Sequence, residues 1–213
     1  MKFIVYTLPY AISNEADKIN QLFESGLDEL HIRKPGYSKD DLCSLLNLIN
    51  RDYHPRIVLH HHYSLMKSFI LKGIHLPKGY FNGFFGKFKK IKFHRIKRFQ
   101  LSTTIDNIKN VEYVDTMFDI VFIGPMYKKL GEQNSLSNFD AFEVKNVISS
   151  TTKNVYAYGG IEFKNQHRIN QLGFKGMVLQ SSLWKSGDVV NTFNAFLLSQ
   201  AEMGNMSPAF KIA

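Results

Sequence analysis

Short apolar runs of strand length recur along the whole chain, and each is followed by a stretch whose apolar residues have helical spacing. Such runs, bounded by glycine or polar residues, are typical of buried strands, whereas apolar spacings of three and four residues are typical of helices. The runs occupy residues 3–6, 29–33, 56–60, 74–76, 98–101, 120–124, 155–158 and 176–179. Eight strand–helix units in one chain predict a single α/β domain folded as a (β/α)8 barrel, the TIM barrel.

The expected helices lie between these runs, at residues 14–25, 38–51, 64–72, 106–111, 139–149, 164–172 and 189–200. A doubly wound open sheet is the alternative α/β arrangement. No glycine-rich dinucleotide fingerprint follows the first strand, however, because Leu8, Pro9 and Tyr10 stand there. The periodicity fades after residue 201, so we expect a barrel domain over residues 1–201 and a C-terminal tail over residues 202–213.

The composition excludes several classes of protein. With 213 residues and 44% hydrophobic side chains, the chain can bury a full core and is not of disordered type. The single cysteine, Cys43, excludes an internal disulfide framework and multi-cysteine metal sites, and its place in a helix indicates a core residue. No apolar run approaches the roughly 20 residues that span a bilayer, and the N-terminal segment is too short and polar for a secretion signal. We therefore expect a cytoplasmic protein without membrane contact.

The formal net charge of +9 comes mostly from one segment. Residues 87–98 contain seven Lys or Arg and no acidic residue, and without them the chain has 20 basic and 18 acidic residues. The segment is either a phosphate-binding patch or a solvated face whose Phe and Ile residues turn to the core. No nucleic-acid motif accompanies it, so we do not expect a nucleic-acid partner.

Polar residues follow most of the expected strands and should meet at one mouth of the barrel. This set is cationic or hydrogen-bonding, with hardly a carboxylate, and therefore fits an anionic ligand. Its members are His31, Arg33, His60, His61, His62, Lys78, Ser102, Tyr127, Lys128, Lys129, Gly159, Gly160, Gln180 and Ser181.

Two glycine-containing turns follow the seventh and eighth strands, at residues 158–161 and 176–182. Barrels often hold phosphate there on backbone N–H groups, and glycine lets the oxyanion approach the backbone. The alternative is a pair of ordinary turns. We predict that Gly159, Gly160, Gln180 and Ser181 bind phosphate.

His31 and Arg33 share one side of a strand because side chains alternate, and an inward Arg at the mouth can bind a phosphate or diphosphate through two hydrogen bonds. Pairing of that Arg with a neighbouring helix is the alternative. If the third strand runs through His60, His61 and His62, the first and last share a face. These histidines could donate to an anionic ligand, shuttle protons or simply be satisfied at the rim; a metal site lacks supporting carboxylates or cysteines, so we predict no metal ligands.

The ordered motifs HIRKP, IVLHHH, GIHLP, LSTT, FDIVFIGP, YGGI and GMVLQSS resemble those of the thiamine phosphate synthase and TenI family over roughly residues 1–200. The resemblance implies a TIM barrel. Synthases join an aminopyrimidine diphosphate to a thiazole phosphate and release pyrophosphate with the help of Mg²⁺. TenI-type tautomerases isomerise a carboxythiazole phosphate without a metal.

Carried onto this sequence, the resemblance assigns catalysis to Arg33, His60 and His61. Together with the polar residues expected at the mouth, it leads us to expect substrate binding by His31, Lys34, His62, Ser102, Lys128 and Lys129, and phosphate binding by Gly159, Gly160, Gln180 and Ser181. His60 and His61 stand at the family's asparagine–aspartate pair, and Tyr80 at its second aspartate. Mg²⁺ is thus implied as a cofactor, but its usual ligands are not found. The tautomerase base is also replaced, because Pro125 stands at its position.

The leading hypothesis is therefore a transferase that resembles thiamine phosphate synthase. A TenI-like tautomerase and a non-catalytic barrel that binds phosphorylated ligands are the alternatives. All three imply phosphorylated small molecules as partners, and the sequence leaves open whether copies of the chain form a homo-oligomer.

Overall fold

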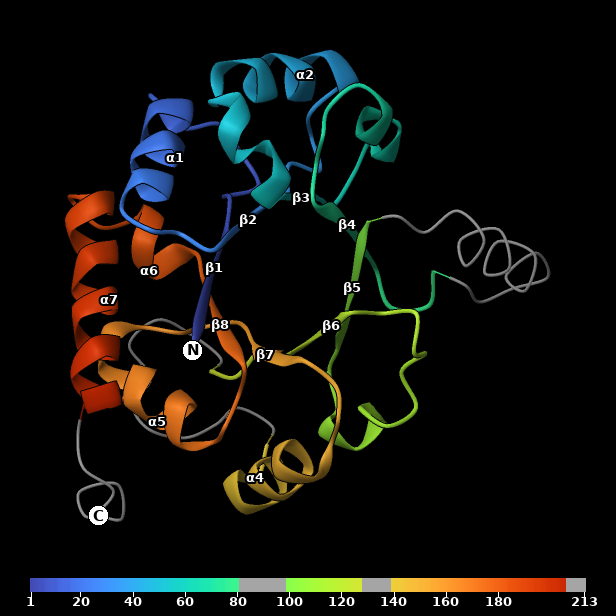
Figure 1. Cartoon of the computed structure of the whole chain (residues 1–213), viewed down its shortest axis with the longest axis vertical. Coiled ribbons are helices and arrows are strands. Elements are labelled where there is room, and N and C mark those ends of the chain that lie inside the picture. Colours follow the sequence, from blue (N-terminus) through green and yellow to red (C-terminus); the bar gives the residue numbers. More distant parts are fainter. Residues whose placement is uncertain (81–98, 128–138, 206–213) are drawn as a thin grey trace.

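Eight parallel strands form a closed barrel with helices on its outside (Figure 1). The structure is a computed structural model that describes residues 1–80, 99–127 and 139–205. The strands are β1 (Lys2–Tyr6), β2 (Glu29–Ile32), β3 (Ile57–Leu59), β4 (Gly73–Leu76), β5 (Gln100–Ile105), β6 (Ile120–Ile123), β7 (Val155–Ala157) and β8 (Gly176–Leu179). β1 pairs with both β2 and β8, which closes the sheet. The predicted single (β/α)8 barrel is confirmed.

The long connections carry the α-helices that surround the barrel in Figure 1. These are α1 (Glu15–Glu24), α2 (Lys39–Leu48), α4 (Ala141–Ser150), α5 (Gln166–Gln171), α6 (Ser181–Trp184) and α7 (Val189–Asn205). A capping box begins α2: the Ser38 Oγ accepts from the Asp41 N–H at 3.1 Å, and the Asp41 carboxylate accepts from the Ser38 N–H at 3.0 Å.

Two expected helices, at residues 64–72 and 106–111, are instead the short 3₁₀ turns η2 (Tyr63–Lys67) and η3 (Ile108–Asn110). They join strands separated by only 13 and 14 residues, which leaves little chain for a full helix and the return to the sheet. α6 has no counterpart among the expected helices, and α7 continues past residue 201 to Asn205. The basic segment 87–98 lies outside the described residues.

The interior of the barrel is divided into an apolar half and a polar half. Alternation along the strands points every second side chain inward. Strands β1, β6, β7 and β8 contribute an apolar cluster of Ile4, Tyr6, Ile120, Phe122, Tyr156 and Val178. Strands β2, β4 and β5 instead turn Glu29, His31, His75 and Ser102 into the same space, all of them buried. The polar half is where a site can form.

The turn after β7 packs against the turn after β6, and two glycines make this possible. Gly159 has a φ of +88° and Gly160 a φ of +68°. A Cβ on Gly159 would lie 2.6 Å from the Pro125 Cβ, and one on Gly160 would lie 2.6 Å from the Tyr127 O. Backbone geometry and close packing therefore account for both glycines without a ligand.

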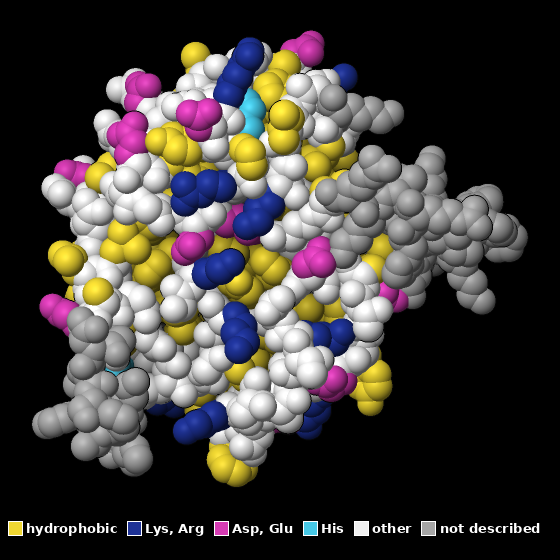
Figure 2. All heavy atoms as spheres, in the orientation of Figure 1, with side chains coloured by type: hydrophobic (Ala, Val, Ile, Leu, Met, Phe, Trp, Pro, Cys, Tyr) yellow, Lys and Arg dark blue, Asp and Glu magenta, His cyan; other side chains and the backbone are white. Residues whose placement is uncertain are grey.

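Basic and acidic side chains are interspersed on the face shown in Figure 2, where several Lys and Arg side chains lie in a column down the middle.

None of the helices in the described part of the chain combines the length and apolarity that a membrane crossing requires.

We predict that Gly159→Ala lowers the free energy of unfolding by about 1–3 kcal/mol or more. The backbone there has a positive φ, which alanine rarely adopts, and the new Cβ would collide with the Pro125 ring. Denaturant titration measures the change. Gly187→Ala is the matched control, since a Cβ there meets nothing within 4 Å; its effect should stay within about 0.5 kcal/mol. Equal stability of the two variants would contradict the prediction.

Candidate active site

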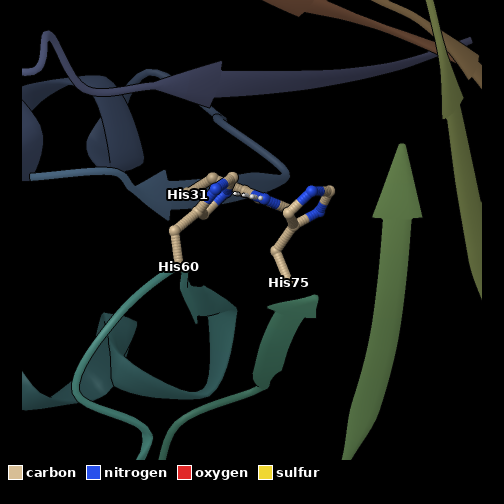
Figure 3. Close-up of side chains that lie close together, drawn as sticks. All are labelled: His31, His60 and His75. Atoms are coloured by element: carbon tan, nitrogen blue, oxygen red, sulfur yellow. Dashed lines mark hydrogen bonds between the residues drawn. The ribbon is translucent and has the colours of Figure 1, made fainter. Parts of the chain in front are cut away.

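Three histidines from neighbouring elements converge inside the polar half of the barrel (Figure 3). His31 lies on β2, His60 directly follows β3, and His75 lies on β4. Their exposed fractions are 0%, 8% and 7%. The rings of His60 and His75 stack with centroids 4.3 Å apart, and the ring of Tyr6 stacks on His31 at 4.8 Å. Ring packing thus contributes to holding the three histidines together.

The carboxylate of Glu29, two residues before His31 on β2, is hydrogen-bonded to the cluster. It accepts a hydrogen bond from His31 Nε2 at 2.7 Å and one from Gln100 Nε2 at 2.9 Å, and it forms an ion pair with Lys72 Nζ at 2.6 Å. Burial raises the pKa of Glu29, but the hydrogen bond from His31, the charge that His31 carries when protonated in acid, and the charge of Lys72 outweigh it and lower the pKa to about 2. Glu29 is therefore ionised and fully partnered.

The carboxylate of Glu29 determines which nitrogen of His31 carries the proton. A carboxylate only accepts, so His31 Nε2 must donate to Glu29, and its Nδ1 keeps a lone pair. That Nδ1 lies 2.9 Å from His60 Nε2, which consequently donates to it. Glu29, His31 and His60 form one hydrogen-bonded chain that runs from the barrel interior toward the mouth.

His75 sits between two hydroxyl groups of β5. Its Nδ1 lies 3.1 Å from Ser102 Oγ and its Nε2 lies 3.1 Å from Thr104 Oγ1. Burial, followed by the charges of His31, Arg33 and His61, lowers the pKa of His75 to about 3. Burial lowers the pKa values of His31 and His60 as well, so all three imidazoles are neutral at neutral pH.

Arg33 stands at the mouth above the histidines, and its side chain is exposed. Its backbone is held by Thr7, whose Oγ1 accepts from the Arg33 N–H at 2.9 Å. The guanidinium charge contributes, after burial, to lowering the pKa values of His60, His61 and His75, which places it beside them. Among residues 1–80, 99–127 and 139–205, no carboxylate forms an ion pair with it. Within the part of the chain that the structure describes, Arg33 is thus an exposed cation without an acidic partner.

Two predicted substrate-binding residues, Lys34 and His62, make contacts within the protein itself. Lys34 is buried and pairs with Glu15 at 2.7 Å, while its Nζ also donates to the Tyr10 O. His62 adopts a left-handed φ of 52°, and its Nε2 lies 2.7 Å from the Tyr37 O. β3 ends at Leu59, so the strand does not continue through the three histidines that follow it. His60 faces the barrel interior, His61 is half-buried, and His62 belongs to the turn that leads into η2. A role in substrate binding for Lys34 and His62 stays a prediction.

The predicted phosphate-binding residues lie together at the ends of β7 and β8. Neither the Gly159 N–H nor the Gly160 N–H donates to a described residue. Gln180 is already engaged, because its Nε2 donates to the Thr7 O at 2.8 Å, and Ser181 begins α6. Phosphate binding by these residues stays a prediction, and Lys128 and Lys129 lie outside the described residues.

The donor set does not fit the Mg²⁺ that the family resemblance implies. His60 and His61 supply imidazole nitrogens and Tyr80 a phenol, whereas Mg²⁺ prefers carboxylate and water oxygens in octahedral geometry. Asp106, which directly follows β5, is exposed and already pairs with Lys78 Nζ at 2.8 and 3.0 Å.

Glu29 and His75 escaped the prediction of site residues from sequence. Glu29 stands two residues before His31, so strand alternation alone would have placed both inside the barrel. His75 is in the middle of a short apolar run that is expected to form a strand. A polar side chain at such a position needs either a polar partner inside the barrel or contact with water. Lys72 and Gln100 carry no comparable signal, since their contact with Glu29 depends on strand register.

Comparisons with known proteins show where this barrel belongs. No family model matches the sequence. The thiamine-phosphate synthase of Staphylococcus saprophyticus is 23% identical over 194 residues, which cover 85% of this chain and 86% of that protein. The crystal structure of thiamine phosphate pyrophosphorylase from Bacteroides thetaiotaomicron is 30% identical and has a TM-score of 0.78, with 97% of this chain and 100% of that chain covered. The corresponding Pyrococcus furiosus structure, 14% identical, has a TM-score of 0.75 and covers 94% and 96%.

The neutral histidines predict a loss of stability in mild acid. In the unfolded chain a histidine binds a proton near pH 6.5, whereas folded His75 binds one only near pH 3. Between these values, each unit by which the pH falls therefore lowers the free energy of unfolding by up to about 1.4 kcal/mol through His75. We expect His75→Gln to reduce the slope of unfolding free energy against pH by about one proton between pH 6 and pH 5. Denaturant titrations across that range measure it, and identical slopes for the two proteins would refute the assignment of a neutral His75.

Proposed function

This chain belongs, as a divergent member, to the thiamine phosphate synthase and TenI family, and from that membership we propose that it is a synthase-type transferase. The proposed reaction joins an aminopyrimidine diphosphate to a thiazole phosphate and releases pyrophosphate. Its substrates are phosphorylated small molecules, and the proposed compartment is the cytoplasm.

The position of Arg33 carries the proposal. It is an exposed guanidinium without a carboxylate partner among the described residues, at the end of the barrel where TIM-barrel enzymes bind substrates. A guanidinium can donate two parallel hydrogen bonds to a diphosphate. As the bond between carbon and the diphosphate oxygen breaks, the electron pair and the negative charge move onto the leaving group. Arg33 would stabilise that charge, which is the costly part of this step.

The surroundings of Arg33 suit the other product of that bond cleavage, a pyrimidine cation. His31, His60 and His75 are uncharged at neutral pH, and Tyr6 and Phe122 border them with aromatic rings. A neutral, aromatic wall does not repel a cation and keeps water from trapping it. The half-buried His61, whose pKa is lowered by burial and then by Arg33, can donate a neutral N–H to a diphosphate oxygen.

We propose that the thiazole phosphate is held at the turns after β7 and β8. The N–H groups of Gly159 and Gly160 lack acceptors among the described residues, so they are available donors. Their lack of a Cβ, whatever its structural origin, also permits close approach of an oxyanion.

The test supplies both substrates to the purified chain, with and without Mg²⁺, and measures pyrophosphate and thiamine phosphate. We expect Arg33→Ala to lower kcat/KM by about 10²–10³-fold because an interaction with the leaving group is lost. Arg33→Lys should retain more of the wild-type kcat/KM than Arg33→Ala, because lysine keeps the positive charge but cannot donate two parallel hydrogen bonds as a guanidinium does. Arg51→Ala, an exposed arginine on the 3₁₀ turn η1 (Arg51–Arg56), is the matched control. Absence of product from folded wild-type protein under both conditions would overturn the synthase assignment.

A second function, isomerisation of a carboxythiazole phosphate, is favoured by the chain of Glu29, His31 and His60. A base backed by an oriented imidazole and a carboxylate can move a proton without a metal. His60 has a depressed pKa from burial and neighbouring histidines, so it is unprotonated at neutral pH and could accept a substrate proton after its ring reorients.

The two functions separate in one experiment. If the chain is a tautomerase, isomerisation proceeds without a second substrate and His60→Gln lowers kcat by at least about 10²-fold, while Arg33→Ala acts mainly on KM. An unchanged isomerisation rate in His60→Gln would exclude the histidine base. Retention of thiazole phosphate binding with neither reaction would instead indicate a non-catalytic binder.

A further inference from the structure

We propose that His31, His60 and His75 form a binding site for a divalent transition-metal ion of the zinc type inside the barrel. One ring nitrogen of each histidine lies within 4.8 Å of the others, and all three residues are buried. The site differs from the Mg²⁺ position that the family resemblance implies: it shares His60 with that position, but its other two ligands are interior side chains of β2 and β4, and it has no carboxylate ligand. It does not depend on which reaction the chain catalyses.

The spacing suits a tetrahedral ion after small movements. Metal–nitrogen bonds of roughly 2.0–2.1 Å in tetrahedral geometry place the ligand nitrogens roughly 3.3 Å apart. His31 Nδ1 and His60 Nε2 are 2.9 Å apart, and the stacked rings of His60 and His75 bring the third donor alongside (Figure 3). An ion between them requires a few tenths of an ångström of separation at one pair and a closer approach of the third ring.

The protonation pattern determines which ring nitrogens could become ligands and which hydrogen bonds an ion would replace. Donation from His31 Nε2 to Glu29 leaves His31 Nδ1 as a ligand, the carboxylate–histidine arrangement that orients many metal-binding imidazoles. Ser102 Oγ lies 3.5 Å from the Ile74 O, to which it can donate, and then accepts from His75 Nδ1. The lone pair is then on His75 Nε2, where it accepts from Thr104 Oγ1 at 3.1 Å, so an ion bound there would replace that hydrogen bond. For His60, binding through Nε2 requires its proton to move to Nδ1.

The electrostatics determine the remaining ligand. Three neutral imidazoles add no charge, and Glu29 is already balanced by Lys72 at 2.6 Å. A divalent ion bound only by these imidazoles would leave two uncompensated positive charges in the barrel interior. An anionic fourth ligand, such as hydroxide or a substrate oxygen, would reduce that charge. Three histidines with an open fourth position are characteristic of catalytic rather than structural zinc sites.

The donor type selects the metal. Imidazole nitrogen suits Zn²⁺, Co²⁺, Ni²⁺ and Cu²⁺, whereas Mg²⁺ requires oxygen donors. Binding of an ion would also break the hydrogen bond between His31 and His60, so the metal site and the proton chain of the tautomerase hypothesis exclude one another in a given molecule.

The test titrates full-length protein without an affinity tag with Co²⁺, in the absence of substrate, and follows the visible absorption of tetrahedral Co²⁺. We expect saturation at one ion per chain and displacement by Zn²⁺. His31→Gln, His60→Gln and His75→Gln should each weaken binding at least 10-fold and remove the tetrahedral bands. Glu29→Gln should weaken it by about 10–100-fold, because the orienting carboxylate is lost.

Two controls test whether the interior cluster is responsible. His167→Gln removes an exposed histidine of α5, and the double variant His61→Gln/His62→Gln removes the neighbours of His60 in sequence. Both should bind Co²⁺ within about 2-fold of the wild type. Loss of binding in the double variant would place the ion at the mouth and overturn the proposal.

Thermal unfolding gives a readout that a folding defect does not imitate. Zn²⁺ should raise the Tm of the wild type and of His167→Gln, but not that of His75→Gln, whose circular dichroism should show a folded barrel. If His75→Gln does not fold, the wild-type Co²⁺ spectrum and the Glu29→Gln affinity decide the question. No saturable binding by the wild type, or only octahedral Co²⁺, would overturn the proposal, whatever the outcome of the synthase assay.

Discussion

The buried carboxylate of Glu29 is the interaction on which the interior of this barrel depends. It joins β2 to Lys72 just before β4 and to Gln100 on β5, and it determines the tautomer of His31. An unpaired buried charge would be strongly destabilising, so the three partners must be present together. Through His31 the same constraint reaches His60 at the mouth. Stability and site geometry thus share one set of contacts.

The division of the barrel interior explains how one fold can carry this set. Ile4, Phe122 and Val178 fill the apolar half with ordinary core packing. The polar half replaces such packing by hydrogen bonds and stacked neutral rings, which are tolerated because Glu29, His31 and His75 have hydrogen-bond partners. Histidine serves here because its neutral form packs as an aromatic ring and still offers one donor and one acceptor.

Much of the fold could be predicted from the sequence, because eight apolar runs with intervening helical spacing suit few architectures other than this barrel. The convergence of His31, Arg33 and His60 followed from strand alternation and the shared carboxyl ends of the strands. The engagement of Lys34 with Glu15 did not, since that contact joins the loop after β2 to α1. The short turns η2 and η3 were also missed, because local periodicity does not measure how far a connection must travel.

The amino-acid pattern alone predicted the barrel class and the family, because these follow from residue type and order. Only the tertiary structure decided that His75 joins His31 and His60, that Glu29 is their common anchor, and that Gly159 and Gly160 are required by packing against the turn after β6. Those contacts join residues far apart in the chain, and the register of neighbouring strands, which brings His75 opposite Ser102, exists only once the sheet has closed.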